Sequence, residues 1–442
     1  MENYTLLKDA YFGTGGFETG GYLTKHKRES EDDYTFRRKN AYYLNYFAPI
    51  VNALVDPVFK KEPLRDYTGA ASSFVEAFLD DVDGNGTDIG AFMKRAAIMA
   101  KTYGVAFIVV DNFGDKIARS RAEQLAMRKF PYVYVMAPED VQEYGMDRMG
   151  NLNYIKFREI NKIDNGATSY RYTTYGRDSW KIEGDDLPVT SGTYNLGRVP
   201  VVPLFSRVLE QKTMKPVPEL MPIAKTAVSL YNHCSWLGEI LRNQTFPLLT
   251  IPSLDATELT IGNNNALGYS PDSSHTPDFI APSSDPAKTL QEQITLLVQE
   301  MYRMVNLSYV LGSTPSNVSG VARQWEFERT NQQLANFAHQ CEDAEKAVLD
   351  LFAAWLNSDI EYTVIYPNDF GVVDVAAQIE QAQAVLDLGL TNGIREEVLK
   401  QVITAYCPGI SDERFDELVG ELQQQDEDEL HAEQPEPPEP QE

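Results

Sequence analysis

The most informative part of the sequence is residues 285–357, DPAKTLQEQITLLVQEMYRMVNLSYVLGSTPSNVSGVARQWEFERTNQQLANFAHQCEDAEKAVLDLFAAWLN. Its first part predicts a helix in which Asp285 is the N-cap and Pro286 is the first helical residue. A loop of small and polar residues follows at 311–320. The pattern then predicts a second helix from about 320 to 357, which would span about 55 Å at 1.5 Å per residue.

The two predicted helices differ in where their apolar side chains lie. The first has an apolar stripe along its length, formed by Leu290, Ile294, Leu297, Val298, Met301 and Val305. We expect this stripe to pack against neighbouring helices of the same or the next subunit. In the long helix the stripe is confined to the part from Leu334 to Trp355, and the earlier part is polar all round. We therefore expect the long helix to extend beyond its own core and to meet something outside it.

The rest of the chain alternates helical and strand patterns and predicts an α+β fold. Apolar residues at helical spacing predict helices at about 33–56, 88–103 and 219–245. Asp88 is the expected N-cap of the second of these, and Gly104 ends it before the buried strand VAFIVV. Residues 130–206 alternate in polarity between turn residues, which favours an antiparallel meander. IEYTVIYP predicts a strand that returns to this β region.

Other segments differ from these helices and strands in composition, since they are rich in Pro, Ser, Asn, Gly or Glu. Residues 247–286 are short β-like pieces rich in Pro, Ser and Asn, between two helices. Residues 11–23 are rich in glycine, and we expect the first 32 residues to form a flexible arm. Shorter helices are predicted at about 374–424. The Glu-, Pro- and Gln-rich end after them is disordered on composition.

Charge and cysteine content narrow the functional classes. The net charge is −26, and argues against ordinary DNA wrapping, in which Lys and Arg replace counterions. Residues 421–442 hold nine acids and no Lys or Arg, so the first 420 residues still carry −17. An acidic surface can nevertheless help DNA slide without sticking. Three widely spaced cysteines suit a reduced cytoplasm, and no apolar run is long enough to predict a membrane span.

Enzyme motifs are missing from the sequence. The glycine-rich arm lacks the third glycine of a dinucleotide fingerprint, and no Gly-Lys-Ser/Thr occurs. Five histidines show no metal-ligand spacing. Asp81, Asp83 and Asn85 match the first half of a calcium loop, but Phe92 stands where a bidentate carboxylate is needed, so a helix-entry turn is the main interpretation. We expect no catalytic residues and no cofactor.

Taken in order, these elements resemble the portal protein of tailed bacteriophages, the ring at the unique capsid vertex. RRKNAYYLNYFAPIVNALVDPVFKKEP is similar to the portal's entry helix, and KTYGVAFIVVD to its helix-to-strand step. The resemblance covers about residues 30–425 and rests on the order of elements. It implies a flexible arm (1–32), a wing (33–218), a first stem helix (219–246), a clip (247–285), a second stem helix (286–310), a tunnel loop (311–320), a long tunnel helix with a return strand (320–373), a crown (374–424) and a disordered acidic tail (425–442).

The resemblance also implies a function. Portal subunits form a closed ring, commonly of twelve, around a channel for double-stranded DNA, and ring closure needs heterologous contacts. The tunnel loop would bring Gly312, Ser313, Thr314, Pro315, Ser316, Asn317, Val318 and Ser319 to the channel. It holds no Lys or Arg, so we expect it to brush DNA without binding sequence or phosphate.

The partners implied by the resemblance are a terminase motor that docks at the clip, the head-tail adaptors that later replace it, and the major capsid protein. The chain would assemble in the host bacterial cytoplasm and remain in the virion, without a membrane. Two alternatives stay open: another virion assembly protein, such as an adaptor or scaffold, and a hydrolase assisted by calcium at Asp81, Asp83 and Asn85.

Overall fold

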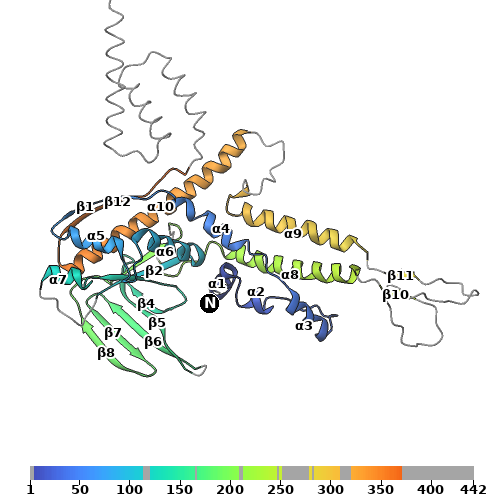
Figure 1. Ribbon diagram of the computed structural model, residues 1–442, viewed down its shortest axis with the longest axis horizontal. Helices are drawn as coiled ribbons and strands as arrows, with labels where there is room; N and C mark the ends of the chain where they lie inside the picture. Colours follow the sequence, from blue (N-terminus) through green and yellow to red (C-terminus); the bar gives the residue numbers. More distant parts are fainter. Residues whose placement is uncertain are drawn as a thin grey trace, which may run out of the picture. The chain divides into compact units, whose positions relative to one another are not determined.

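The computed structural model of the protein describes residues 4–112, 120–164, 167–208, 213–245, 248–250, 278–280, 283–308 and 320–370 (Figure 1). The chain divides into two compact units, Met1–Phe370 and Gly371–Glu442. The second unit lies outside the described residues, and with it the predicted helices at 374–424 and the acidic tail. The first unit combines helices with antiparallel sheets, so the predicted α+β class is confirmed.

A three-stranded sheet lies at the centre of the first unit. Its strands are β2 (Val105–Asp111), β3 (Tyr132–Met136) and β9 (Val201–Phe205), in the order β3-β2-β9. Helix α6 (Ile89–Tyr103) precedes β2, and the Asp88 side chain caps it by accepting from the amide of Ala91. Gly104 ends the helix with a φ of +87°, a conformation that favours glycine. The predicted step from helix to buried strand is confirmed.

The predicted meander forms a second, five-stranded antiparallel sheet. Its strands, in spatial order, are β4 (Val141–Met146), β5 (Leu152–Asp164), β6 (Ala167–Gly176), β7 (Ser179–Gly184) and β8 (Leu187–Thr193). One face packs on the central sheet, where Phe107 of β2 meets Phe157 of β5. The Tyr175 hydroxyl donates to Asp111 across this boundary over 2.9 Å. Burial raises the pKa of Asp111, so this contact holds a carboxyl away from water.

The long helix α10 packs across the central sheet. It runs from Gly320 to Leu356, as predicted, and its apolar stripe from Leu334 to Phe352 is buried in one core. Helix α5 (Ser72–Asp80), the short 3₁₀ helix η1 (Asp56–Phe59) and helix α6 complete that core. Phe78 and Phe352 stack there with ring centroids 4.4 Å apart. The short helix α7 (Arg121–Ala126) precedes β3.

The strand predicted from IEYTVIYP has an unexpected neighbour. It is β12 (Ile360–Ile365), and it pairs with β1 (Leu64–Gly69) in a separate two-stranded antiparallel sheet. Strand β1 is not predicted by the sequence pattern. The pairing brings the segment after η1 next to the segment after α10. The periodicity within either segment does not predict this pairing, because the two are far apart in the sequence.

The prediction of a flexible arm over residues 1–32 is wrong for the part that the structure describes. Helices α1 (Tyr4–Phe12) and α2 (Gly16–Thr19) fold back into a second core, where Leu7 and Phe17 are buried. Glycines at positive φ permit the tight turns between them, and the Asp9 carboxylate accepts from the Tyr22 hydroxyl over 2.6 Å. The glycines in this segment therefore allow tight turns between packed helices, and do not make the segment flexible.

The predicted helix at 33–56 is two helices. Helix α3 (Glu31–Asn40) ends where Ala41 adopts an extended conformation, and α4 (Phe47–Ala53) begins after a short connection. Proline cannot continue a helix interior because it lacks an N–H and its ring clashes with the preceding turn. Pro49 is tolerated in the first turn of α4, where its missing N–H would have no helical partner. Pro49 therefore fits a new helix that begins at Phe47, whereas α3 has already ended at Asn40.

Candidate functional site

Helices α8 (Met221–Thr245) and α9 (Asp285–Arg303) lie side by side as an antiparallel hairpin (Figure 1). Both predicted helices are confirmed, although α9 ends at Arg303 and not near 310. The N-cap of α9 is Ser284, one residue before the predicted Asp285. At the far end a short ribbon of β10 (Leu248–Thr250) and β11 (Asp278–Ile280) continues from the helices. The residues from 251 to 277 lie outside the described part of the chain.

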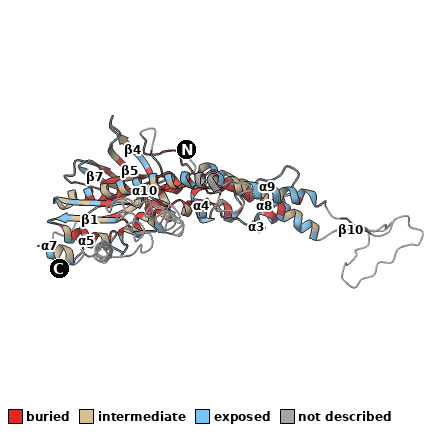
Figure 2. Cartoon of the chain, turned by 90° about the horizontal axis from the view of Figure 1, so that it is seen from above, coloured by how far each residue is buried: buried red, intermediate tan, exposed pale blue. Residues whose placement is uncertain are grey.

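The predicted stripe of α9 faces the hairpin and the core beneath it. Val298, Met301 and Val305 are buried, and Ile294 and Leu297 are partly buried against the same cluster. Leu290, nearer the tip, is half-buried. Figure 2 shows buried positions on both helices among exposed ones. Most of the stripe is therefore covered within one subunit, whose cluster also contains Leu230, Tyr231, Cys234 and Leu237 of α8.

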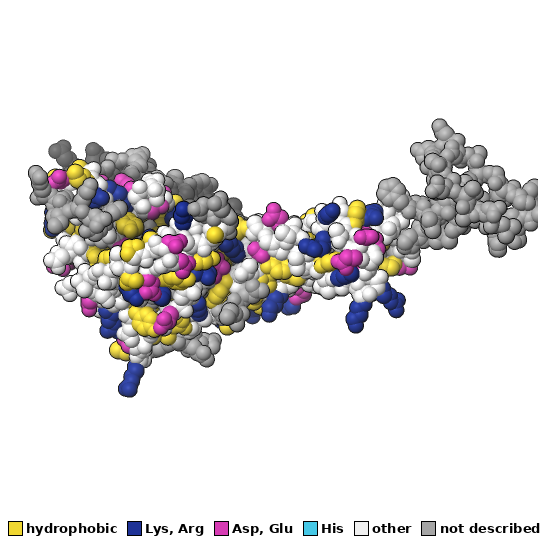
Figure 3. All heavy atoms as spheres, turned by 90° about the horizontal axis from the view of Figure 1, so that it is seen from below, with side chains coloured by type: hydrophobic (Ala, Val, Ile, Leu, Met, Phe, Trp, Pro, Cys, Tyr) yellow, Lys and Arg dark blue, Asp and Glu magenta, His cyan; other side chains and the backbone are white. Residues whose placement is uncertain are grey.

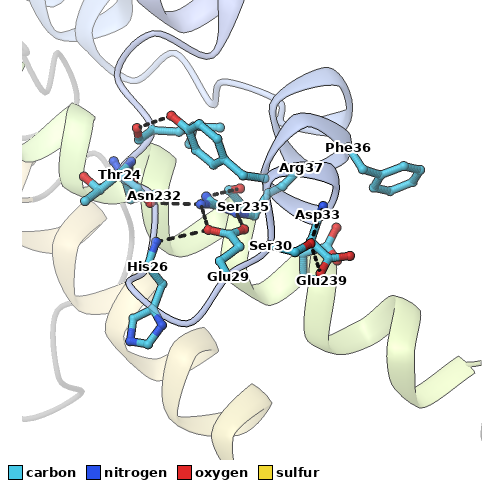
Figure 4. Close-up of polar contacts among 12 residues, drawn as sticks. Thr24, His26, Glu29, Ser30, Asp33, Phe36, Arg37, Asn232, Ser235 and Glu239 are labelled. Atoms are coloured by element: carbon cyan, nitrogen blue, oxygen red, sulfur yellow. Dashed lines mark hydrogen bonds and ion pairs between the residues drawn. The ribbon is translucent and has the colours of Figure 1, made fainter.

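Helix α3 is attached to α8 through Arg37, a buried cation that is also ion-paired with Glu29 (Figure 4). The Arg37 guanidinium, on α3, contacts the Glu29 carboxylate through Nε at 2.7 Å and Nη2 at 2.8 Å. It also donates to Ser235 of α8 and to the carbonyl of Thr24. The Arg37 contact lowers the pKa of Glu29. Every nitrogen of the guanidinium thus has a partner, as a buried cation requires.

A second buried cation connects α6 to the start of the hairpin and to α10. Lys101 is 2% exposed, and its Nζ donates to the Ser206 carbonyl at 2.8 Å and to Glu219 at 2.9 Å. The ammonium lies over the Phe337 ring, 4.3 Å from the centroid. Phe337 belongs to α10, so one side chain joins three elements that are far apart in the sequence.

Helix α10 is also fixed by a buried carboxylate. Glu345 is fully buried and accepts from the Arg65 guanidinium at 2.7 and 3.1 Å. The hydroxyls of Tyr362 and Tyr366 donate to the same carboxylate at 2.5 and 2.6 Å. Trp355, near the end of the helix, donates its indole N–H to the Val110 carbonyl. The C-terminal half of α10 is therefore held to β1, β12 and β2.

Near its N-terminal end α10 touches the end of α9. The Thr330 hydroxyl donates to the Asn306 carbonyl over 2.9 Å, and Asn306 has a φ of +60°. This contact joins the segment just after α9 to the early part of α10, and the predicted tunnel loop connects these two segments along the chain. Residues 312–319 themselves lie outside the described residues, so their predicted role stays a prediction.

The calcium candidate forms a turn before α6. The Asp81 carboxylate accepts from the amides of Gly84 and Gly86 and contacts Arg128 at 2.9 Å. Burial would raise the pKa of Asp81, but these donors outweigh it and the pKa is lowered. Asp83 accepts from the Asn85 amide in the same turn. The oxygens that calcium would need already hold the turn and Arg128.

The described residues also bear on the metal-assisted and membrane alternatives. Among the described residues, no group of three or more His, Cys, Asp or Glu side chains is arranged to hold a metal ion. In the same part of the chain, no helix has the length and apolar character to cross a membrane. Sequence reasoning missed Arg37, Lys101 and Glu345, because only the fold shows that these charges are buried.

Comparisons with known proteins give structural neighbours alone. No protein-family model and no curated protein matches the chain. A chain from the virion of a native gene transfer agent particle has a TM-score of 0.46 at 10% identity, over 90% of this chain and 93% of the other. Chains from the neck of the native particle, computed with C12 symmetry, and of the empty particle, computed with C6 symmetry, have TM-scores of 0.41 and 0.45, each at 10% identity. These cover 85% and 87% of this chain and 89% and 99% of the others.

Proposed function

We propose that this chain is a structural subunit of a tailed-phage-like particle, and that twelve copies form the portal ring at the capsid vertex. One observation carries the proposal. A two-helix hairpin with a strand ribbon at its far end is followed along the chain by a 37-residue helix whose second half is locked into an α/β body. That order is the one on which the sequence resemblance rests.

In this proposal the body is the wing, α8 and α9 are the stem, and the segment around β10 and β11 is the clip. The buried contacts of Lys101 and Glu345 tie the start of the hairpin and α10 to the body, and Arg37 ties α3 to α8. Such ties favour a stiff subunit, which suits a ring that must keep its shape while DNA passes. The ring would be a passive channel that does not read sequence, with residues 312–319 lining it.

The proposed partners follow from this arrangement. Double-stranded DNA would pass through the channel during packaging and ejection. The terminase motor, and later the head-tail adaptors, would dock at the clip, and the major capsid protein would surround the ring. Assembly would occur in the host cytoplasm, before incorporation into the virion.

The mass of the purified particle tests the proposal. We expect a ring near twelve times the 49.7 kDa chain, with a central hole visible by negative-stain microscopy. Native mass spectrometry would count the copies. A stable monomer that turns over a substrate would overturn the proposal.

Deletion of residues 312–319 tests the channel separately. We expect rings with an unchanged number of copies, because the deletion retains every residue of the described hydrophobic cores. DNA packaging or retention in particles should fall. Loss of the ring itself would show that the loop is placed wrongly.

A further inference from the structure

A groove of about 170 Å³ lies between α3 and α8. Its walls include Phe36, Tyr42, Cys234, Gly238, Glu239 and Arg242. Phe36 and Tyr42 are 41% and 54% exposed, so large apolar side chains border open space. A Cβ built on Gly238 meets nothing within 4 Å, which leaves room for an incoming side chain.

The charge at the rim of this groove comes from Arg242. Its guanidinium stacks over the Phe36 ring, 3.8 Å from the centroid, and lies 3.6 Å from Glu239. Arg242 keeps 44% of its side chain exposed, whereas Arg37 on the groove floor has every nitrogen occupied. Figure 3, which views the molecule from below, shows Lys and Arg side chains beside hydrophobic ones on the hairpin.

The opposite side of the hairpin presents a matching feature on α9. Leu296 is 47% exposed. At 3.6 residues per turn it points about 180° away from Ala287, which is buried. Glu292 lies one turn earlier on the same face, is exposed, and has no ion-pair partner within the described part of the chain. A lone apolar side chain next to an unpaired carboxylate is complementary to an apolar groove with a cation at its rim.

The positions along the hairpin are compatible with a cyclic assembly. The Gln244 side chain donates to the Ser283 carbonyl, which fixes how the antiparallel helices align. By that alignment Leu296 lies about 10 Å along the hairpin from the level of Gly238. Copies in a ring are related by rotation, which does not change the position of a residue along the ring axis. If the hairpin is inclined to that axis, Leu296 of one copy and Gly238 of the next can lie at the same level along it. Because α3 and α9 pack on different sides of α8, the contact would be head-to-tail (Figure 1).

We infer that the α3–α8 groove receives Leu296 of the next copy of this chain, with Glu292 of that copy facing Arg242. The inference rests on the proposed ring and names the contact that closes it. It is a heterologous contact: each copy gives Leu296 to one neighbour and its groove to the other. Burial of Leu296 and Phe36 would supply affinity, and the charge pair would set the register.

Cysteine pairing tests this contact in the full chain. Both cysteine pairs are placed in a Cys234→Ser background, which removes the native thiol from the groove wall. In that background the variant Gly238→Cys/Leu296→Cys should form disulfides between neighbours under mild oxidation. Since every copy carries both positions, a denaturing gel should show a ladder up to the full ring. The matched control is Lys225→Cys/Leu296→Cys, in which position 225 is exposed on the same helix but about 20 Å from Gly238. It should give no ladder.

Charge reversal provides an independent readout. Arg242→Glu should raise the concentration at which rings fall apart by about tenfold, and Arg242→Glu/Glu292→Arg should restore it. If native mass shows wild-type rings but neither the ladder nor the restoration appears, the groove inference is wrong and the ring stands. If the wild-type chain forms no ring at any concentration, the proposed function fails first.

Discussion

Single residues show how this subunit handles buried polarity. Lys101, Arg37 and Glu345 are charged and almost fully buried, yet each has several partners from distant parts of the chain. A buried ion pair adds little net stability, but removal of one partner leaves an uncompensated charge. Such groups therefore specify one arrangement of helices more than they stabilise it.

Tyr231 is an exception to this pairing. Its ring is buried beside Phe17 and Tyr43, and its hydroxyl has no hydrogen-bond partner within the described residues. Tyr231→Phe should leave the free energy of unfolding unchanged or raise it by about 1 kcal/mol, because an unsatisfied polar group is removed. Tyr366→Phe is the control. The Tyr366 hydroxyl donates to Glu345, so this variant should lower the free energy of unfolding by about 1–3 kcal/mol. Urea denaturation measures both, and equal losses would contradict the assignment.

Asp140 should give a pH dependence of the opposite sign to an ordinary ion-paired aspartate. Burial and the neighbouring charge of Glu139 raise the pKa of Asp140 to about 6. Because the folded pKa lies above the unfolded value of 3.8, this group destabilises the fold as pH rises from about 4 to 6. The advantage of Asp140→Asn over wild type should appear across that window and stay constant above it. Thermal melts of both proteins from pH 4 to 8 measure it, and a flat difference would refute the shift.

At the scale of elements, the arrangement of the helices depends on where each helix ends and on the side-chain contacts that hold it to its neighbours. The helix predicted at 33–56 is interrupted between Asn40 and Phe47, and the resulting helix α3 lies against α8 through Arg37. Helix α10 keeps the length expected from its sequence because its buried half faces a continuous core. The pair β1–β12 then attaches to α10 through Glu345.

Removal of Arg65 tests this attachment. Arg65→Met leaves the Glu345 carboxylate buried without its cation, and should lower the free energy of unfolding by about 3–5 kcal/mol. Arg65→Met/Glu345→Met should recover part of that loss, since no buried charge remains. Arg198→Met is the control, because its contact with Asp350 is 4.0 Å long and exposed, and should change stability by less than about 1 kcal/mol. A double variant no more stable than the single one would contradict a role through charge.

At the scale of the whole molecule, the net negative charge of each chain works against assembly of the proposed ring, because the copies repel each other. Each chain carries −26, so a proposed ring of twelve copies concentrates negative charge. Residues 421–442 carry nine acids and no Lys or Arg, so the tail holds a large share of that charge. Assembly of the ring should therefore depend on salt and on the tail.

We predict that rings form more completely as salt rises from about 20 to 150 mM, because the Debye length shortens and repulsion between copies is screened. A chain ending at residue 424 loses eight of its acids and should form rings at lower salt than the full chain. Light scattering after gel filtration measures the fraction in rings for both chains. Rings that dissociate as salt rises would show that attraction between surface charges dominates.

Much of the local structure can be predicted from the pattern of apolar residues. Periodic apolar residues placed α6, α8, α9 and α10 to within a few residues at most ends, and alternation placed the meander. It also predicted which side of α9 and α10 would be buried, because helical spacing alone puts those residues on one face. The exceptions, at the N-terminal glycines and between Asn40 and Phe47, are residues whose backbone conformation depends on their neighbours.

Contacts between elements that are distant in the sequence are visible only in the folded chain. Strand β1 pairs with β12 across almost 300 residues of chain, and Leu7 and Phe17 belong to the core of the hairpin. Pairing and burial at such separations depend on shape and on satisfied polar groups, and neither has a local period in the sequence. For the same reason the groove beside Arg242 is visible only once α3 lies on α8, and the buried state of Arg37, Lys101 and Glu345 is a property of the fold.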